Sequence, residues 1–170
     1  MSDKDTQASA PTAAPSPMEL VMQFHHTYSV PIRPVTDPTL DYERMTMRMS
    51  LIAEEFAELM GAVYGPRARK IIETATRQAL AADDDERDLI ESADALADLV
   101  YVIYGMAIES GIDLDSVLAE VQASNLSKLM PDGSVKLRED GKVLKGPNFF
   151  QPNIARGLGL TTDKKPLEAD

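Results

Sequence analysis

Residues 48–59 read RMSLIAEEFAEL, and residues 88–100 read DLIESADALADLV. In both stretches acidic residues stand among apolar ones at spacings of three and four. Side chains at this spacing share one face of a helix, so each stretch predicts a helix that is apolar and carries a row of carboxylates. The first row is Glu54, Glu55 and Glu58, and the second is Glu91, Asp94 and Asp98. Helical periodicity of this kind indicates an all-α fold.

The apolar periodicity continues on both sides of these stretches and predicts five helices. We expect them over residues 17–28, 41–64, 66–82, 88–110 and 114–129. Ser16 and Glu19 have the spacing of a capping box, and Gly65 and Gly111 are typical helix ends. The fourth helix is apolar on more than one side, which predicts a central position among its neighbours. The expected architecture is a four- to five-helix bundle-type domain.

The two ends of the chain differ in composition from its middle. Residues 1–16 are rich in Ala, Pro, Ser and Thr, which is typical of a disordered tail. The domain is expected over residues 17–155, and a flexible tail over residues 156–170. Within the domain, residues 131–153 contain two Asp-Gly turns flanking short alternating segments, which predicts an irregular or hairpin C-terminal segment.

Composition excludes several classes of function. The 170 residues contain 17 Lys and Arg against 28 Asp and Glu, so the net charge of −11 argues against nucleic-acid binding. The absence of Cys excludes disulfides and thiol catalysis and fits a cytoplasmic protein. The most apolar stretch, residues 96–112, is short and contains Asp98 and Glu109, so we expect no membrane span.

The two rows of carboxylates predict a cation site. Like charges on adjacent helical turns repel, and carboxylates with apolar neighbours need a compensating cation if they are partly buried. Few basic residues are near in sequence, and all-oxygen ligands suit Mg²⁺, Mn²⁺ or Ca²⁺. No Glu-x-x-His pair is present, which disfavours a di-iron site. Spacing alone also allows a solvated acidic face that binds a basic partner protein.

The combined pattern resembles the MazG-like all-α nucleoside triphosphate pyrophosphohydrolases. This superfamily also includes the dimeric dUTPases and phosphoribosyl-ATP pyrophosphohydrolase. The resemblance lies in EExxE followed, after an intervening helix, by ExxD, and in the stretches at residues 93–114 and 121–129. Residues 21–34 and 141–154 are similar to the branch with dUTPase-type activity. The resemblance as a whole extends over residues 18–154. The interval between Glu58 and Glu91 is slightly longer than in the usual motif of the family.

The resemblance implies roles for the acidic residues. Glu55, Glu58, Glu91 and Asp94 would be Mg²⁺ ligands, with Glu54 completing the cluster and Mn²⁺ as a substitute metal. Either Glu54 or Glu55 would orient or deprotonate the attacking water. The resemblance also implies a homo-oligomer, commonly a dimer, with sites near helix–helix interfaces.

A triphosphate substrate would also need polar and positive contacts. The candidates near the end of the domain are Asn125, Lys128, Lys142, Lys145 and Asn148. The other interpretation of these residues is ordinary surface Lys and turn Asn. Phe149 and Phe150 have two interpretations: they stack on a base, or they dock the C-terminal segment on the helices.

The expected reaction is hydrolysis of a nucleoside triphosphate to the monophosphate and pyrophosphate. The similarity of residues 141–154 to the dUTPase-type branch makes dUTP the first expected substrate. Phosphoribosyl-ATP hydrolysis and a broader house-cleaning activity on non-standard dNTPs are the enzymatic alternatives. An acidic helical interaction module is the non-enzymatic one.

Overall fold

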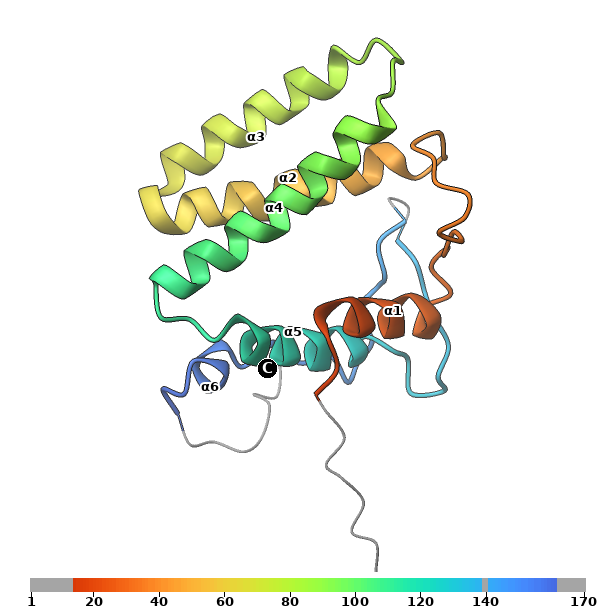
Figure 1. Ribbon diagram of the computed structural model, residues 1–170. Helices are drawn as coiled ribbons and strands as arrows, with labels where there is room; N and C mark the ends of the chain where they lie inside the picture. The colour runs from red at the N-terminus through yellow and green to blue at the C-terminus, as the bar shows by residue number, and fades with distance from the viewer. Residues whose placement is uncertain (1–13, 139–140, 162–170) are drawn as a thin grey trace, which may run out of the picture. The chain divides into compact units, whose positions relative to one another are not determined.

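The computed structural model describes residues 14–138 and 141–161. Within these ranges the chain forms six helices and no strand, which confirms the predicted all-α fold (Figure 1). The helices belong to two compact units. One unit combines the two ends of the chain, residues up to Ile32 and from Ala107 onward, and the other comprises Arg33–Met106. We call them the terminal unit and the central unit.

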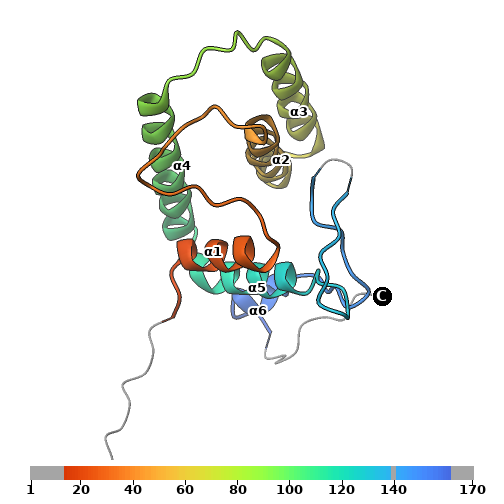
Figure 2. The same cartoon turned by 90° about the vertical axis from the view of Figure 1, so that its right-hand side faces the viewer.

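The terminal unit is built around two long helices, α1 (Pro17–Thr27) and α5 (Leu114–Leu126), which lie side by side (Figures 1 and 2). The predicted capping box at the start of α1 is present, with the Ser16 side chain bonded to the backbone of Glu19 and the reverse contact also made. The buried Tyr28 donates its hydroxyl to the carbonyl oxygen of Asn125, at 2.7 Å. Helix α1 is thereby held to the end of α5.

The C-terminal segment docks on α5. The hydroxyl of the buried Ser124 donates to the carbonyl oxygen of Phe150 at 2.7 Å, and the Phe150 amide donates to the Ser127 hydroxyl at 3.1 Å. These backbone contacts support the docking interpretation of the Phe149–Phe150 pair. A short helix, α6 (Ile154–Gly157), follows and packs against α5. This helix is not among the five that the sequence predicts.

Residues 131–138 and 141–146 are rich in turns and pair with each other in a hairpin-like contact. The amide of Arg138 donates to the Lys142 carbonyl, and the Leu144 amide donates to the Lys136 carbonyl, both at 2.8 Å. One antiparallel bridge joins Leu137 to Val143 without extending into a strand among the described residues. The expected N-terminal tail falls almost wholly on residues 1–13, and most of the expected C-terminal tail on 162–170, both outside the described ranges.

The central unit contains α2 (Met45–Tyr64), α3 (Pro66–Ala81) and most of α4 (Leu89–Glu109). Helices α2 and α3 meet at Gly65, whose φ of 92° is readily adopted only by glycine, and they pack against each other as a hairpin. Helix α2 begins four residues later than predicted. The amide of Asp41 is bonded to the Thr39 hydroxyl, a local contact that competes with helix formation.

Helix α4 does not have the central position that its apolar sequence predicted. Ala107 is its one buried residue among those described, and large side chains such as Leu96, Val100 and Tyr101 are exposed. No single described helix is long and apolar enough to cross a membrane. Helices α4 and α5 pass such a test only jointly, by length and composition, and the pair is bent by 114°.

Buried apolar side chains are few in the described part of the chain. They are Tyr28, Ala57 and Ala107, while α2 and α4 expose many large apolar residues. A sequence that is 44% hydrophobic contains enough apolar surface for a larger core than this. A single chain therefore leaves much apolar surface uncovered.

Candidate active site

The acidic group of α2 lies on one exposed side of the helix. Glu54, Glu55 and Glu58 are all exposed, whereas Ala57 is buried. The spacing of one, three and four residues gathers the three carboxylates on adjacent turns, as the sequence predicted. The three carboxylates therefore share one exposed side of α2.

Glu58 already interacts with a cation, the guanidinium of Arg69 on α3. Arg69 donates Nη2 to Oε1 of Glu58 at 2.9 Å and Nε to Oε1 of Glu73 at 2.9 Å. The Arg69 contact holds the pKa of Glu73 below its usual value, and the Glu73 contact raises the pKa of Arg69. Arg69 follows Glu58 by eleven positions across the α2–α3 turn, so proximity in the sequence does not reveal it as a partner of Glu58.

The second acidic group lies near the beginning of α4. Glu91, Asp94 and Asp98 follow one another at spacings of three and four and are exposed. The amide of Glu91 is bonded to Oδ1 of Asp88 at 3.0 Å, so Asp88 caps the helix start. Asp98 is exposed although its sequence neighbours are apolar, because Leu96 and Leu99 are themselves uncovered in the single chain.

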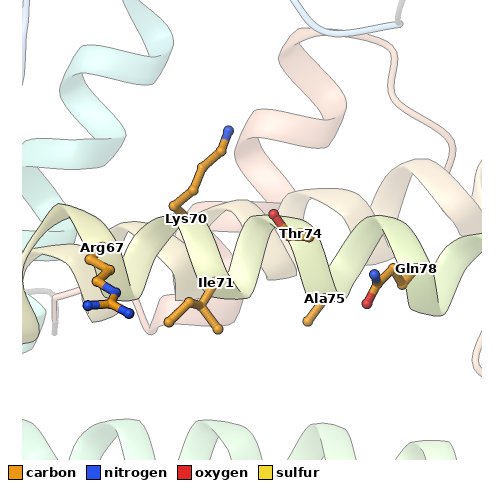
Figure 3. Close-up of a pocket in the computed structure, with 6 residues that line it drawn as sticks. All are labelled: Arg67, Lys70, Ile71, Thr74, Ala75 and Gln78. Carbon is orange, nitrogen blue, oxygen red and sulfur yellow. The ribbon is translucent and has the colours of Figure 1, made fainter.

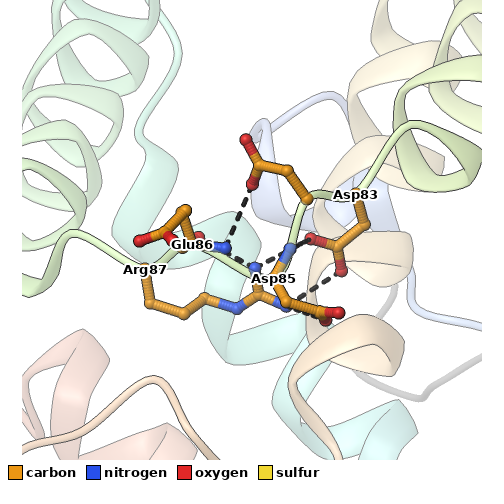
Figure 4. A network of polar contacts seen from close by, with 5 residues as sticks. Asp83, Asp85, Glu86 and Arg87 are labelled. Carbon is orange, nitrogen blue, oxygen red and sulfur yellow. Dashed lines mark hydrogen bonds and ion pairs between the residues drawn. The ribbon is translucent and has the colours of Figure 1, made fainter.

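The loop before α4 is ordered by its own charges. Arg87 donates Nη1 and Nη2 to the two carboxylate oxygens of Asp83, at 2.8 and 2.9 Å (Figure 4). This fork-shaped contact lowers the pKa of Asp83. The backbone amides of Asp85 and Glu86 donate hydrogen bonds to the side-chain carboxylates of Asp83 and Asp84, respectively. Asp85 has a positive φ of 63° in this turn. Arg87 thus stabilises the loop from which α4 starts.

The structure does not bring the two acidic groups into one cluster. Across residues 14–138 and 141–161, no three His, Asp or Glu side chains are close enough together to hold a metal ion. Glu54, Glu55 and Glu58 remain together on α2, and Glu91 and Asp94 remain together on α4. The five-carboxylate site implied by the resemblance therefore stays a prediction.

The candidate substrate contacts belong to the terminal unit, whereas the carboxylates belong to the central unit. Lys128 donates Nζ to Oδ1 of Asn125 at 2.7 Å. Nζ of Lys145 lies 4.2 Å from the ring centre of Phe149, a cation–π contact. Lys142 lies in the hairpin-like segment, and Asn148 is exposed in the turn before Phe149. Two pairs are therefore established, Lys128 with Asn125 and Lys145 with Phe149.

A cavity of about 360 Å³ lies along α3 (Figure 3). Its lining residues come from successive turns of this helix: Arg67, Lys70, Ile71, Thr74, Ala75 and Gln78. The lining combines apolar side chains with the cationic side chains of Arg67 and Lys70. The spacing of these residues by three and four was visible in the sequence, but a basic and apolar helix face has no specific functional signature.

Comparison with known proteins was made at the level of family, curated protein and solved structure. Residues 21–125 match the family model described as phosphoribosyl-ATP pyrophosphohydrolase. The search of curated proteins finds no match. Among solved structures, the chain is similar to a "putative NTP pyrophosphohydrolase" from Exiguobacterium sp. 255-15, with a TM-score of 0.65 and 27% sequence identity. The similarity covers 85% of this chain and 95% of that chain.

The matched family region contains both acidic groups, the α2–α3 hairpin and nearly all of α5. It also includes parts of both compact units, so the similarity extends well beyond one motif. The chain therefore belongs to the phosphoribosyl-ATP pyrophosphohydrolase family of all-α hydrolases that act on nucleotides.

Proposed function

We propose that this protein is a Mg²⁺-dependent nucleoside triphosphate pyrophosphohydrolase with dUTP as its substrate. The observation that carries the proposal is the acidic group of α2, Glu54, Glu55 and Glu58, within the matched family region. The similarity of residues 141–154 to the dUTPase-type branch favours dUTP among nucleotides.

The proposed ligands have the donor chemistry that a divalent cation requires. All of the proposed ligands, Glu54, Glu55, Glu58, Glu91 and Asp94, supply carboxylate oxygens, which Mg²⁺ prefers and Mn²⁺ accepts. Glu58 already accepts a hydrogen bond from a cationic group at 2.9 Å, so its carboxylate is oriented toward a positive charge. When bound, the metal would neutralise phosphate charge and activate water.

The chain's own residues would act on the water and on the phosphates. Glu54 or Glu55 accepts the proton of the attacking water, whose oxygen bonds to one of the two phosphorus atoms joined by the α–β bridging oxygen. The bond between that phosphorus and the bridging oxygen breaks, which gives the monophosphate and pyrophosphate. Asn125, Lys128, Lys142, Lys145 and Asn148 are the proposed contacts to the phosphates and the nucleoside. Lys145 is braced by the Phe149 ring, which restricts its freedom before substrate arrives.

A second copy of the chain is part of this proposal. Helices α2 and α4 carry the acidic groups, and the same helices expose large apolar side chains such as Phe56, Leu59 and Leu99. Large exposed apolar side chains on the helices that carry the acidic groups favour an interface with another copy. A homodimer that covers it would exclude water around the carboxylates, which would strengthen their interaction with a cation. The site is then expected to be complete only in the oligomer.

The testing experiment is pyrophosphate release from a panel of dNTPs, NTPs and phosphoribosyl-ATP, with and without Mg²⁺. Mg²⁺-dependent release from dUTP, in preference to the other substrates, is the expected result. Release from phosphoribosyl-ATP alone would instead establish the second candidate function, which the description of the matched family favours. If no substrate releases pyrophosphate, with Mn²⁺ also tried, hydrolysis is rejected. The acidic helical interaction module is then the remaining interpretation.

A further inference from the structure

We propose that Arg69 is a positioning residue for Glu58: it holds the Glu58 carboxylate while no metal is bound, and it must release that carboxylate when a divalent cation binds. Arg69 thereby sets the metal affinity of the acidic group of α2. The inference rests on the proposed function, because it takes Glu58 as a metal ligand.

The first support is that one guanidinium binds two carboxylates through different nitrogens. Nη2 of Arg69 contacts Oε1 of Glu58, and Nε contacts Oε1 of Glu73. Glu58 belongs to α2, whereas Glu73 belongs to α3, one turn beyond Arg69. Loss of the Glu58 contact therefore leaves Arg69 paired with Glu73 on its own helix, so release creates no unpaired charge.

The second support is the close approach of α3 to α2 at Gly61. A Cβ atom at position 61 would lie 3.0 Å from Cβ and 3.4 Å from Cδ of Arg69. Glycine at this position, one turn after Glu58, lets the Arg69 side chain lie directly on α2. The reach of Arg69 to Glu58 is thus a consequence of how the two helices pack, rather than of a freely moving surface side chain.

The third support is the exposure of the Arg69–Glu58 pair, because breaking an exposed ion pair costs little free energy. The side chains of Arg69 and Glu58 are 45% and 49% exposed. Exposed ion pairs are weak, so a divalent cation with several carboxylate ligands can replace the guanidinium at Glu58. Removal of the competing Arg69 should strengthen metal binding by about two- to fivefold, the range that an exposed pair corresponds to.

The experiment is a titration of the full chain with Mn²⁺ in the absence of nucleotide, followed by the electron paramagnetic resonance signal of free Mn²⁺. Arg69→Gln removes both contacts, and Arg77→Gln is the matched control. Arg77 lies on the same helix and donates to Thr74 rather than to Glu58. Arg69→Gln should bind Mn²⁺ about two- to fivefold more tightly than wild type, and Arg77→Gln should change affinity much less.

The same pair of substitutions in a Glu58→Gln background separates the direct contact from general charge effects. There, Arg69→Gln should lose most of its advantage, because the carboxylate for which arginine and metal compete is gone. Equal affinity of Arg69→Gln and Arg77→Gln, or weaker binding by Arg69→Gln, would overturn the role of Arg69 and leave hydrolysis untouched. Absence of Mn²⁺ binding by the wild type would overturn the role of Arg69 and the metal site together, whereas pyrophosphate release tests the activity independently.

Discussion

At the scale of the residue, the neighbours of a carboxylate determine what it can do. Glu120 on α5 accepts two hydrogen bonds from the guanidinium of Arg156 on α6, and both side chains are largely buried. Glu73 is held by Arg69 and Asp83 by Arg87 at more exposed positions. Glu73, Asp83 and Glu120 are therefore held in place by arginine side chains, whereas Glu91 and Asp94 lie exposed on successive turns of α4 and suit a ligand role.

The first prediction concerns the proposed site. Glu55→Gln and Asp94→Asn should each lower pyrophosphate release by at least about a hundredfold, as expected for loss of a general base or of a metal ligand. Both variants should keep their helical circular dichroism, because these side chains are exposed. Glu109→Gln, an exposed acid at the far end of α4, is the matched control and should retain turnover. Wild-type turnover by Glu55→Gln or Asp94→Asn would reject the site.

The second prediction concerns the pH dependence of stability. The hydrogen bonds from Arg156 hold the pKa of Glu120 below 4.5 in the folded protein. The stabilisation from Glu120 is therefore complete above the unfolded pKa and is lost as pH falls through the folded pKa. Glu120→Gln should lower the free energy of unfolding by about 2 kcal/mol near pH 7, a usual value for hydrogen bonds between charged groups.

Urea denaturation of wild type and Glu120→Gln, at neutral pH and at a pH well below 4.5, measures this difference. The gap between the two proteins should narrow at acid pH, because protonated Glu120 no longer pairs with Arg156 as a carboxylate. A gap that is the same at both pH values would show that the pair contributes through packing rather than through charge.

At the scale of the element, the ends of helices were predictable where a single residue defines them. Ser16 and Asp113 cap α1 and α5 through their side chains, and the α2–α3 turn lies at Gly65 as expected. Helix α5 was predicted to reach residue 129 but ends at Leu126. Its Ser127 hydroxyl accepts a hydrogen bond from the amide of Phe150, a contact between distant parts of the chain that local sequence does not reveal.

The third prediction concerns the docking of the C-terminal segment. A Cβ atom at Gly146 would lie 2.5 Å from the carbonyl oxygen of Leu129, and the Gly146 amide donates to the Lys128 carbonyl. Backbone atoms cannot move aside cheaply, so Gly146→Ala should destabilise the protein by about 1–3 kcal/mol. Thermal unfolding measures the loss. Gly105→Ala, at a helical position with open space for a Cβ atom, should be neutral or stabilising.

A Gly146→Ala protein as stable as wild type would show that the segment can move away from α5 at little cost. Limited proteolysis adds a local readout, because detachment should expose the backbone between Gly146 and Phe150 to cleavage. The Gly105→Ala control should show no new cleavage there.

At the scale of the whole molecule, the fold class and the acidic residues could be predicted from the sequence, but the packing of the site could not. Periodicity identifies which side chains share a face, as for Glu54 and Glu58, without identifying what covers that face. Leu96 and Leu99 flank Asp98 in the sequence, yet all three are exposed in one chain. The surface that buries apolar residues in an oligomer belongs to another copy and has no separate signature in the sequence.

The fourth prediction is therefore that the protein is a homodimer. Sedimentation velocity should give a mass near twice the 18.6 kDa of the chain. Val100→Asp places a charge within the exposed apolar surface of α4 and should shift the protein toward the monomer. Val35→Asp, a substitution at a 95% exposed position in the segment between α1 and α2, is the control and should leave the mass unchanged. A wild-type monomer at micromolar concentration would contradict the proposed interface.

The pairing of α1 with α5 also has a consequence for the time course of synthesis. Tyr28 and Asn125 are 97 residues apart, so at ribosomal elongation rates α1 emerges roughly 5–20 s before its partner helix exists. The α2–α3 hairpin has no such delay, because its contacts are local. We expect the nascent chain to form the α2–α3 hairpin first. Helix α1 would remain without its partner α5 until late in synthesis, so the terminal unit would be among the last parts to fold.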